Sequence, residues 1–196
     1  SSVAVFGNNI DKENTLQSSN LTPSTVYGIS KAAGENWGNY YFEKYGLDVR
    51  SLRYPGVVGF QSLPGGGTTD YAVDIYHKAI KNEPFVCFLD ASTTLPMIYM
   101  DDAIRATIEL MEADKEKITV RTSYNLSGMS FNPEQIASSI KEHYPNLKIA
   151  YKPDFRQAIA NTWPKCIDDT AARNDWNWKP EYDLDLMTKV MIENLK

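Results

Sequence analysis

Short apolar runs alternate along the chain with longer stretches in which apolar residues recur at helical spacing. The short runs are typical of buried strands and the longer stretches of amphipathic helices. The predicted strands cover residues 1–7, 47–54, 85–89, 96–99, 124–126 and 148–151. The predicted helices begin and end near residues 25–45, 69–81, 102–113, 133–143, 169–175 and 183–194. Strands that alternate with helices in this way predict an α/β fold with a mainly parallel sheet.

Several of these elements carry recognisable end signals. Ser24 or Thr25 can cap the first long helix with its hydroxyl oxygen, and Gly46 supplies a C-terminal stop. Asn132–Pro133 is typical of a helix start. Pro55–Gly56 is expected to end the strand that precedes it.

Two pairs of adjacent carboxylates have the composition of a catalytic acid pair. Asp101 and Asp102 stand at the predicted start of a helix, and so do Asp168 and Asp169. Aspartate is a preferred capping residue, because its oxygens accept hydrogen bonds from the first backbone amides of a helix. Both pairs are therefore predicted to be helix caps rather than catalytic groups.

The composition is that of an ordinary globular protein. The 196 residues are 42% hydrophobic and carry a net charge of −5, which is enough chain for one core with a small annex. No basic stripe is present, which argues against nucleic acid and against an anionic membrane surface as partners. No apolar run approaches the ~20 residues that a membrane span needs. We expect a cytoplasmic location, or a mitochondrial one if a transit peptide precedes residue 1.

Cysteine and histidine residues show no metal-ligand spacing, so no metal site is predicted. Cys87 and Cys166 lie far apart in the sequence and are expected to be reduced packing residues, as in a cytoplasmic protein. His77 and His143 fall on predicted helices and are expected to be surface or packing residues.

Tyr27 and Lys31 lie four residues apart on one predicted helix, so their side chains share a face. A free phenol is a poor base at neutral pH, whereas a nearby ammonium group favours the phenolate. Such a pair could take the proton of a substrate alcohol while a hydride leaves for a nicotinamide cofactor. The alternative is an aromatic core residue beside a solvated lysine.

The surroundings of this pair resemble the extended short-chain dehydrogenase/reductase family. Ser2 lies 25 positions before Tyr27, and the matching segments are residues 1–7, 52–59, 100–103 and 168–173. The resemblance implies NAD as the cofactor. It also implies that Ser2 hydrogen-bonds the reacting oxygen, that Tyr27 is the acid/base and that Lys31 also binds the nicotinamide ribose. The backbone that would hold the nicotinamide carboxamide is that of Tyr54, Pro55, Gly56 and Val57.

Other segments resemble the L-threonine 3-dehydrogenase branch of that family, namely residues 63–72, 95–99, 129–131 and 156–164. This likeness implies oxidation of the 3-hydroxyl of L-threonine to 2-amino-3-ketobutyrate, with hydride transfer to NAD. Two rival functions stay open. A nucleotide-sugar 4-epimerase of the same family would need a roomy site for a diphosphate. A non-catalytic binding relative would have no need of Ser2, Tyr27 and Lys31 together.

A glycine run at residues 65–67 precedes a predicted helix but lacks the lysine and the spacing of a phosphate loop. Backbone amides and the helix dipole favour an anion at such a place. Gly66, Thr68 and Thr69 are therefore predicted to hold the substrate carboxylate. The alternative is a flexible loop with Thr68 as a helix cap. Trp163 is predicted to line the substrate pocket, and a buried wedge is the alternative.

Arg53 is interpreted as structural, although it could meet a substrate carboxylate. The helix of Tyr27 also carries a stripe of aromatic residues: Trp37, Tyr40, Tyr41, Phe42 and Tyr45. The resemblance implies a homodimer that forms through this helix, so part of the stripe is expected at an interface. Packing in the core is the equal alternative.

The resemblance also predicts two domains. Residues 1–58 and 96–113 are expected to form the C-terminal half of a Rossmann-type parallel sheet, and residues 59–95 and 114–196 a smaller α/β substrate-binding domain. The glycine-rich turn for the pyrophosphate and the acidic residue for the adenosine ribose are not found in the sequence. We therefore expect about 110 residues of a dinucleotide-binding half to precede residue 1, and the chain alone to bind NAD poorly.

Overall fold

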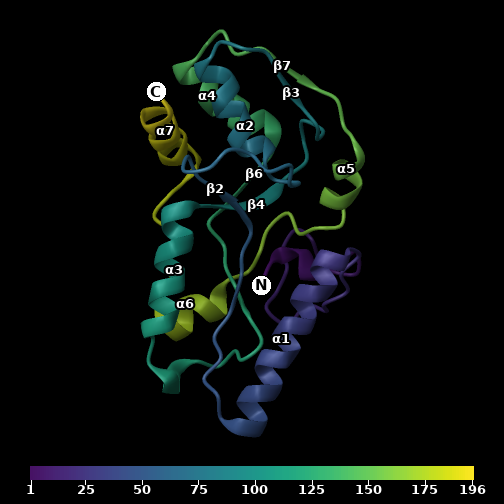
Figure 1. Ribbon diagram of the computed structural model, residues 1–196, viewed down its shortest axis with the longest axis vertical. Coiled ribbons are helices and arrows are strands. Elements are labelled where there is room, and N and C mark those ends of the chain that lie inside the picture. The colour runs from purple at the N-terminus through teal and green to yellow at the C-terminus, as the bar shows by residue number, and fades with distance from the viewer.

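The computed structural model describes all 196 residues (Figure 1). Its α-helices are α1 (Val26–Tyr45), α2 (Tyr71–Ile80), α3 (Met100–Glu112), α4 (Pro133–His143), α5 (Phe155–Ala160), α6 (Thr170–Trp176) and α7 (Leu184–Leu195). Its strands are β1 (Leu52–Arg53), β2 (Gly56–Val58), β3 (Phe85–Cys87), β4 (Leu95–Tyr99), β5 (Tyr124–Asn125), β6 (Met129–Phe131) and β7 (Ile149–Tyr151). Two 3-10 helices are η1 (Val3–Val5) and η2 (Lys115–Lys117).

Parallel pairing dominates the sheets. β1 pairs with β5, β2 with β4, and β3 with β7, all in parallel, and only β6 runs antiparallel, beside β4. In Figure 1, β2, β4 and β6 lie between the end of the molecule that carries α2, α4 and α7 and the end that carries α1, α3 and α6. The prediction of an α/β fold with mainly parallel strands is confirmed.

The first residues of the chain are buried, as predicted, but they do not form a strand. Ser2 makes only an isolated parallel bridge to Tyr54, and Val3–Val5 form η1. The Oγ atom of Ser2 accepts a hydrogen bond from the Ala4 amide at 3.2 Å, which caps η1. The predicted strand over residues 1–7 is therefore wrong, because an apolar run this short has the same pattern in a buried strand and in a buried turn.

The strand before Pro55 ends there, and a second strand begins directly after it. The chain before it, β1, pairs with β5, whereas β2, which begins at Gly56, pairs with β4. Proline has no amide hydrogen, so the hydrogen-bond ladder is interrupted there and the segment changes its partner. The predicted end of the first strand at Pro55–Gly56 is therefore confirmed, whereas the second strand that begins at Gly56 was not predicted.

The predicted ends of the long helices are confirmed. The Thr25 Oγ1 atom caps α1 by accepting from the Gly28 amide at 3.0 Å, and Gly46 follows α1 in a left-handed conformation with φ of 67°. Asn132 and Gln135 form a reciprocal capping box at the start of α4. The Thr25 cap fixes the first turn of α1, which carries Tyr27.

Asp102 is buried and does not cap a helix. α3 starts two residues earlier, with no side-chain cap. The Asp102 carboxylate accepts hydrogen bonds from the amides of Glu181 and Tyr182 and pairs with Arg105 at 2.6 Å. The capping prediction for this pair is wrong, because the amides that need an acceptor belong to a segment about 80 residues later in the chain.

The two aspartates of the second acidic pair, Asp168 and Asp169, have different roles. Asp168 accepts a hydrogen bond from the Thr170 amide at the start of α6, so its predicted capping role is confirmed. Asp169 occupies the N-cap position without a capping bond and pairs with Arg173 at 2.6 Å.

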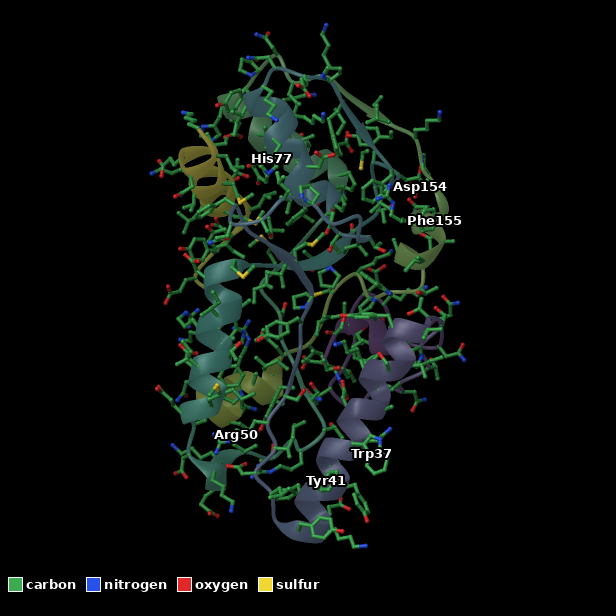
Figure 2. All side chains as sticks on the ribbon, in the orientation of Figure 1. Trp37, Tyr41, Arg50, His77, Asp154 and Phe155 are labelled. Carbon is green, nitrogen blue, oxygen red and sulfur yellow. The ribbon has the colours of Figure 1, made fainter.

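The two larger of three core clusters contain no residue of α1, whereas the third, which is built from Val3, Val5, Phe6 and Ile167, packs against Ala32 of that helix. The largest cluster packs α2, α4 and α7 with β3 and β4, and the second packs α3 and α6 with β1 and β5. In α1 only Gly28 and Glu35 are buried. Figure 2 shows Trp37 and Tyr41 on the outside of this helix, and the exposed residues of the aromatic stripe are Trp37, Tyr40, Tyr41 and Tyr45. The core-packing alternative is wrong for these four residues.

Of the two cysteines only Cys87 is a packing residue. Its side chain is buried, whereas Cys166 is exposed, so the packing prediction is wrong for Cys166. His77 is partly buried on α2 and His143 is exposed on α4. None of the helices combines the length and the hydrophobicity needed to cross a membrane.

Candidate active site

All the predicted site residues except Lys31, Tyr54 and Gly66 line one pocket of about 450 Å³. Its lining residues are Ser2, Val3, Thr25, Tyr27, Pro55, Gly56, Val57, Gly67, Thr68, Thr69, Ile159 and Trp163. They come from the start of the chain, the first turn of α1, the start of β2, the segment before α2 and the region of α5. We call this pocket the cleft.

Tyr27 lines the cleft from the first turn of α1, and 55% of the residue is exposed. Lys31 lies one turn further along the same helix, with its Nζ atom 5.2 Å from the centre of the Tyr27 ring. The structure therefore places a phenol and an ammonium group together, with the phenol accessible to a small molecule. The alternative of an aromatic core residue is excluded by this exposure.

Gly28 allows α1 to approach η1 and so brings Tyr27 near Ser2. A Cβ atom at Gly28 would lie 2.1 Å from the carbonyl oxygen of Ala4, a distance that no side chain tolerates. Ala4 lies in η1, which begins directly after Ser2. Any larger residue at position 28 would therefore force α1 and η1 apart. The glycine is thus a packing requirement of the site.

A buried ion pair fixes the middle of α1. The guanidinium of Arg53, on β1, pairs with the carboxylate of Glu35 at 2.8 Å, and both side chains are almost fully buried. Arg53 also donates to Asn125 on β5, and Ser1 donates to the Glu35 carboxylate at 2.6 Å. Arg53 therefore has a structural role, as predicted, and is not available to a substrate carboxylate.

Glu35 was not predicted from the sequence as part of this arrangement. Its spacing offered a signal, because Tyr27, Lys31 and Glu35 follow one another at intervals of four residues and so share one helix face. A carboxylate on that face needs a partner when the face is buried. The partner of Glu35 cannot be identified from this spacing, because it lies on β1, which contacts α1 only in the folded chain.

Tyr54 is close to the cleft through its backbone alone. Its carbonyl oxygen accepts from the Val3 amide at 3.0 Å, while its hydroxyl forms a hydrogen bond with Thr107 on α3. The following residues, Pro55 to Val57, line the cleft. The predicted contact of this stretch with a nicotinamide is therefore confined to residues 55–57 and to the backbone of Tyr54.

Thr69 packs against the strand that carries this stretch. A Cβ atom at Gly56 would lie 2.6 Å from the Cγ2 atom of Thr69, so the absence of a side chain on β2 makes room for the threonine methyl group. The backbone amides of Thr68 and Thr69 have no hydrogen-bond partner within the chain. Two backbone donors are thus left available beside Tyr27.

The glycine loop, residues 65–67, is held by a side chain of the protein itself. The amides of Gly65, Gly66 and Gly67 all donate to Asp70, at 2.6, 2.7 and 2.9 Å. Gly66 faces a neighbouring pocket and not the cleft. The amide of Gly66, which was predicted to bind the substrate carboxylate, is therefore already paired.

None of the residues that line the cleft has a charged side chain. Trp163 and Ile159 are among its apolar lining residues, and Trp163 is partly buried against the largest and the smallest of the three core clusters at the same time. Both interpretations of Trp163 hold in part, since it lines the pocket and also packs between clusters. Recognition of a small polar ligand therefore depends on backbone amides and hydroxyl groups.

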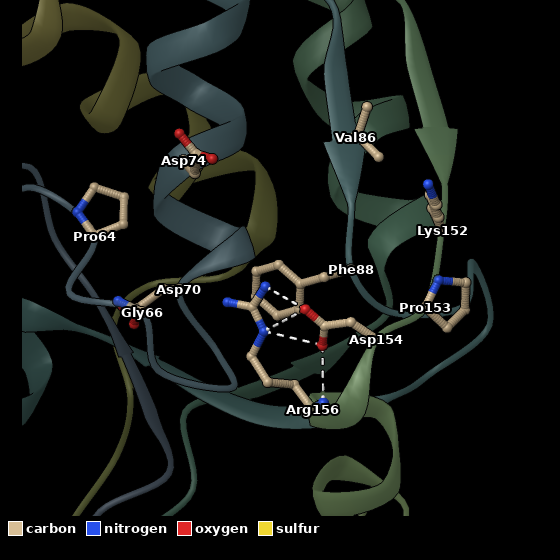
Figure 3. Close-up of a pocket in the computed structure, with 10 residues that line it drawn as sticks. All are labelled: Pro64, Gly66, Asp70, Asp74, Val86, Phe88, Lys152, Pro153, Asp154 and Arg156. Atoms are coloured by element: carbon tan, nitrogen blue, oxygen red, sulfur yellow. Dashed lines mark hydrogen bonds and ion pairs between the residues drawn. The ribbon is translucent and has the colours of Figure 1, made fainter.

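A second pocket, of about 530 Å³, lies beside the glycine loop and was not predicted from the sequence. Figure 3 shows Arg156 paired with Asp154 and lying next to the ring of Phe88, with Gly66 and Asp70 across the pocket. The hydrogen bonds from Arg156 hold the pKa of the Asp154 carboxyl below its usual value. Of the charged residues that line this pocket, only Arg156 and Asp154 form an ion pair with each other.

A sequence model of the NAD dependent epimerase/dehydratase family matches residues 1–127, which include the cleft from Ser2 to Thr69. The chain belongs to this family. An uncharacterized epimerase/dehydratase of Staphylococcus aureus (strain USA300) is 48% identical over 197 residues. That match covers 100% of this chain and 61% of the relative, so the chain spans about three fifths of the length of the curated relatives it matches.

Solved structures of the epimerase/dehydratase fold match the whole chain closely. A GalE-like L-threonine dehydrogenase from Cupriavidus necator, in its apo form, is 55% identical with a TM-score of 0.99, and the chain covers 71% of it. L-Threonine 3-dehydrogenase from Trypanosoma brucei is 41% identical with a TM-score of 0.96, and the chain covers 61% of it. Both matches take in 100% of this chain.

Proposed function

We propose that the whole protein is an NAD-dependent oxidoreductase that oxidises the 3-hydroxyl of L-threonine to 2-amino-3-ketobutyrate. The observation that carries the proposal is the convergence of Ser2, Tyr27 and the Thr68–Thr69 segment on one cleft, with Lys31 one turn along α1. It is supported by the 55% identity to the L-threonine dehydrogenase of Cupriavidus necator.

Tyr27 takes the proton of the substrate hydroxyl in the proposed reaction. A positive charge close to a phenol stabilises the phenolate, and the Lys31 ammonium lies on the same helix face. Ser2 Oγ accepts from the Ala4 amide and donates to no group of the chain, so its hydrogen can be donated to the substrate oxygen. Positioned acid/base groups of this kind typically contribute about 10²–10⁴ in rate.

The residues at the cleft fit the nicotinamide end of NAD. When bound, NAD supplies the acceptor for the hydride that leaves the 3-carbon of the substrate. The uncharged backbone of residues 55–57 lines the same pocket as Tyr27, and Lys31 lies close enough to Tyr27 to reach a ribose hydroxyl there. In the proposed reaction the hydride, with the electron pair of the broken C–H bond, goes to the nicotinamide, and the hydroxyl proton goes to Tyr27.

We propose that the backbone amides of Thr68 and Thr69 hold the substrate carboxylate and that a hydroxyl group of these threonines adds a hydrogen bond to it. Their two amides have no partner in the chain and lie just before Asp70, the N-cap residue of α2, where the helix dipole adds attraction for an anion. The glycine amides are excluded from this role because Asp70 occupies them. Holding the carboxylate fixes the orientation of the reacting carbon, and orientation is a large part of catalysis.

The first test uses the full-length protein with NAD⁺ and L-threonine and follows the absorbance of NADH. NADH should accumulate, and Tyr27→Phe should lower kcat by about 10² or more. Tyr40→Phe is the matched control, because Tyr40 is an exposed tyrosine on the same helix and should leave kcat unchanged. If UDP-galactose is epimerised and L-threonine is not oxidised, the protein is a nucleotide-sugar epimerase. If neither is turned over, it is a non-catalytic relative.

The second test concerns the carboxylate. Thr68→Val and Thr69→Val remove one hydroxyl each, and loss of a hydrogen bond to a charged group should raise the KM for L-threonine about tenfold. The KM for NAD⁺ should stay nearly unchanged. Thr68→Ser keeps the hydroxyl and serves as the control. Normal KM values in both valine variants would remove the carboxylate from this position and leave the assignment of Tyr27 intact.

A further inference from the structure

Asp70 accepts more hydrogen bonds from backbone amides than any helix cap requires. Its Oδ2 atom takes the amides of all three glycines of the loop, at 2.6, 2.7 and 2.9 Å. The residue stands at the N-cap position of α2, yet its side chain makes no capping bond to that helix. The carboxylate is directed away from its own helix and into the preceding loop.

The three amides can converge on one oxygen only because the loop is made of glycine. Gly66 has φ of 97°, in a region that side chains disfavour. A Cβ atom at Gly67 would lie 3.2 Å from the other carboxylate oxygen of Asp70, which leaves little room there. A carboxylate that accepts three charge-assisted bonds from such a flexible segment restricts it strongly.

The restricted loop leads directly to the residues that face Tyr27. Gly67, Thr68 and Thr69 line the cleft, and Thr69 packs on Gly56 from the other direction. The backbone between the glycines and α2 is therefore held at two points. Asp70 binds the amides of the glycine loop, and Gly56 on β2 contacts the side chain of Thr69. The free amides of Thr68 and Thr69 lie between them.

We infer that Asp70 is a positioning residue, which holds the Thr68–Thr69 segment in the place where it receives the substrate. The inference rests on the proposed function for its substrate but not for its geometry. Asp70 itself touches no substrate, since it faces the neighbouring pocket on the other side of the loop (Figure 3). It acts by keeping two backbone donors at a fixed distance from Tyr27.

The test compares Asp70→Asn with Asp74→Asn in the full-length protein. Asp74 lies one turn further along α2, lines the same neighbouring pocket and makes no hydrogen bond to the loop (Figure 3). Asp74→Asn therefore removes the same negative charge from the pocket without changing the hydrogen bonds of the loop. Asp70→Asn should raise the KM for L-threonine about tenfold, should change kcat less than about threefold, and should leave the KM for NAD⁺ unchanged. Asp74→Asn should leave all three constants unchanged.

A second readout does not depend on the substrate. Hydrogen exchange in peptides that cover residues 61–70 should be faster in Asp70→Asn than in the wild type or in Asp74→Asn, because the three amides lose their charged acceptor. Faster exchange with an unchanged KM for L-threonine would overturn the positioning role, and unchanged exchange would overturn the restraint itself. If the wild type does not oxidise L-threonine, the proposed function fails, and the exchange difference alone decides whether Asp70 holds the loop.

Discussion

Some contacts between residues of the site can be predicted from their spacing in the sequence, and others cannot. Tyr27 and Lys31 share a helix, so their proximity follows from their spacing alone. Glu35 and Arg53 meet across two elements, and nothing in their spacing reports this. Asp70 is intermediate, because it lies within five residues of every amide it accepts from, yet no role was predicted for it from the sequence. Local pairs can thus be predicted, whereas pairs between elements require the fold.

The two cysteines should differ in reactivity. Burial raises the pKa of the Cys87 thiol to about 11, so this thiol stays protonated throughout the neutral and mildly alkaline range. Since only the thiolate reacts with alkylating agents, Cys166, which is exposed, should be labelled by iodoacetamide at about pH 8 and Cys87 should not.

Peptide mass mapping of the folded protein after labelling gives the answer residue by residue. In urea both cysteines should be labelled, which controls for the intrinsic reactivity of each peptide. Equal labelling of the two cysteines without denaturant would contradict the burial of Cys87.

At the scale of elements, helices with end signals could be predicted almost to the residue. The threonine cap and glycine stop of α1 and the capping box of α4 are local features, and the sequence contains all the groups involved. The short strands were less predictable. β1 and β2 are separated only by Tyr54 and Pro55 and pair with different strands, and α5, only six residues long, was not predicted at all. Their identity depends on partners far away in the chain.

The contact between α1 and η1 gives a prediction at this scale. Gly28→Ala should destabilise the protein by about 1–3 kcal/mol, since the new methyl group overlaps the Ala4 carbonyl and the overlap exceeds the gain in helix propensity. It should also lower kcat, because α1 carries Tyr27 and must move away from Ser2.

Gly34→Ala is the matched control for this variant. Gly34 lies on the same helix, and a Cβ atom there would meet nothing within 4 Å. This variant should raise stability by up to about 1 kcal/mol and leave kcat unchanged. Urea unfolding measures the stability of both variants. If Gly28→Ala is as stable and active as Gly34→Ala, the close approach of α1 to η1 does not matter for the site.

At the scale of the whole molecule, one face of α1 remains without cover. Its aromatic side chains pack on one another in edge-to-face and tilted pairs, and four of them are exposed. We propose that this face forms a homodimer, with a second copy of the protein as its partner. Exposed apolar patches of this kind are typical of interaction surfaces. The division into two domains, residues 1–58 with 96–113 and residues 59–95 with 114–196, stays a prediction.

Light scattering of the full-length protein tests the dimer. The wild type should have the mass of two chains, and Trp37→Glu should shift it to the mass of one, because a carboxylate cannot be buried unpaired in an apolar interface. Trp37→Phe keeps an aromatic side chain and should remain dimeric. A wild type that is monomeric at every concentration would exclude this role for α1.

The self-paired glycine loop also has a consequence for the design of inhibitors. A glycine-rich turn before a helix usually attracts phosphate, because its amides point outward and carry partial positive charge. Here the carboxylate of Asp70 has already neutralised those amides. A phosphate directed at the loop would meet a negative charge and would lose affinity. An effective ligand should instead be small, should carry a ketone or hydroxyl close to Tyr27, and should end in a carboxylate that reaches the amides of Thr68 and Thr69.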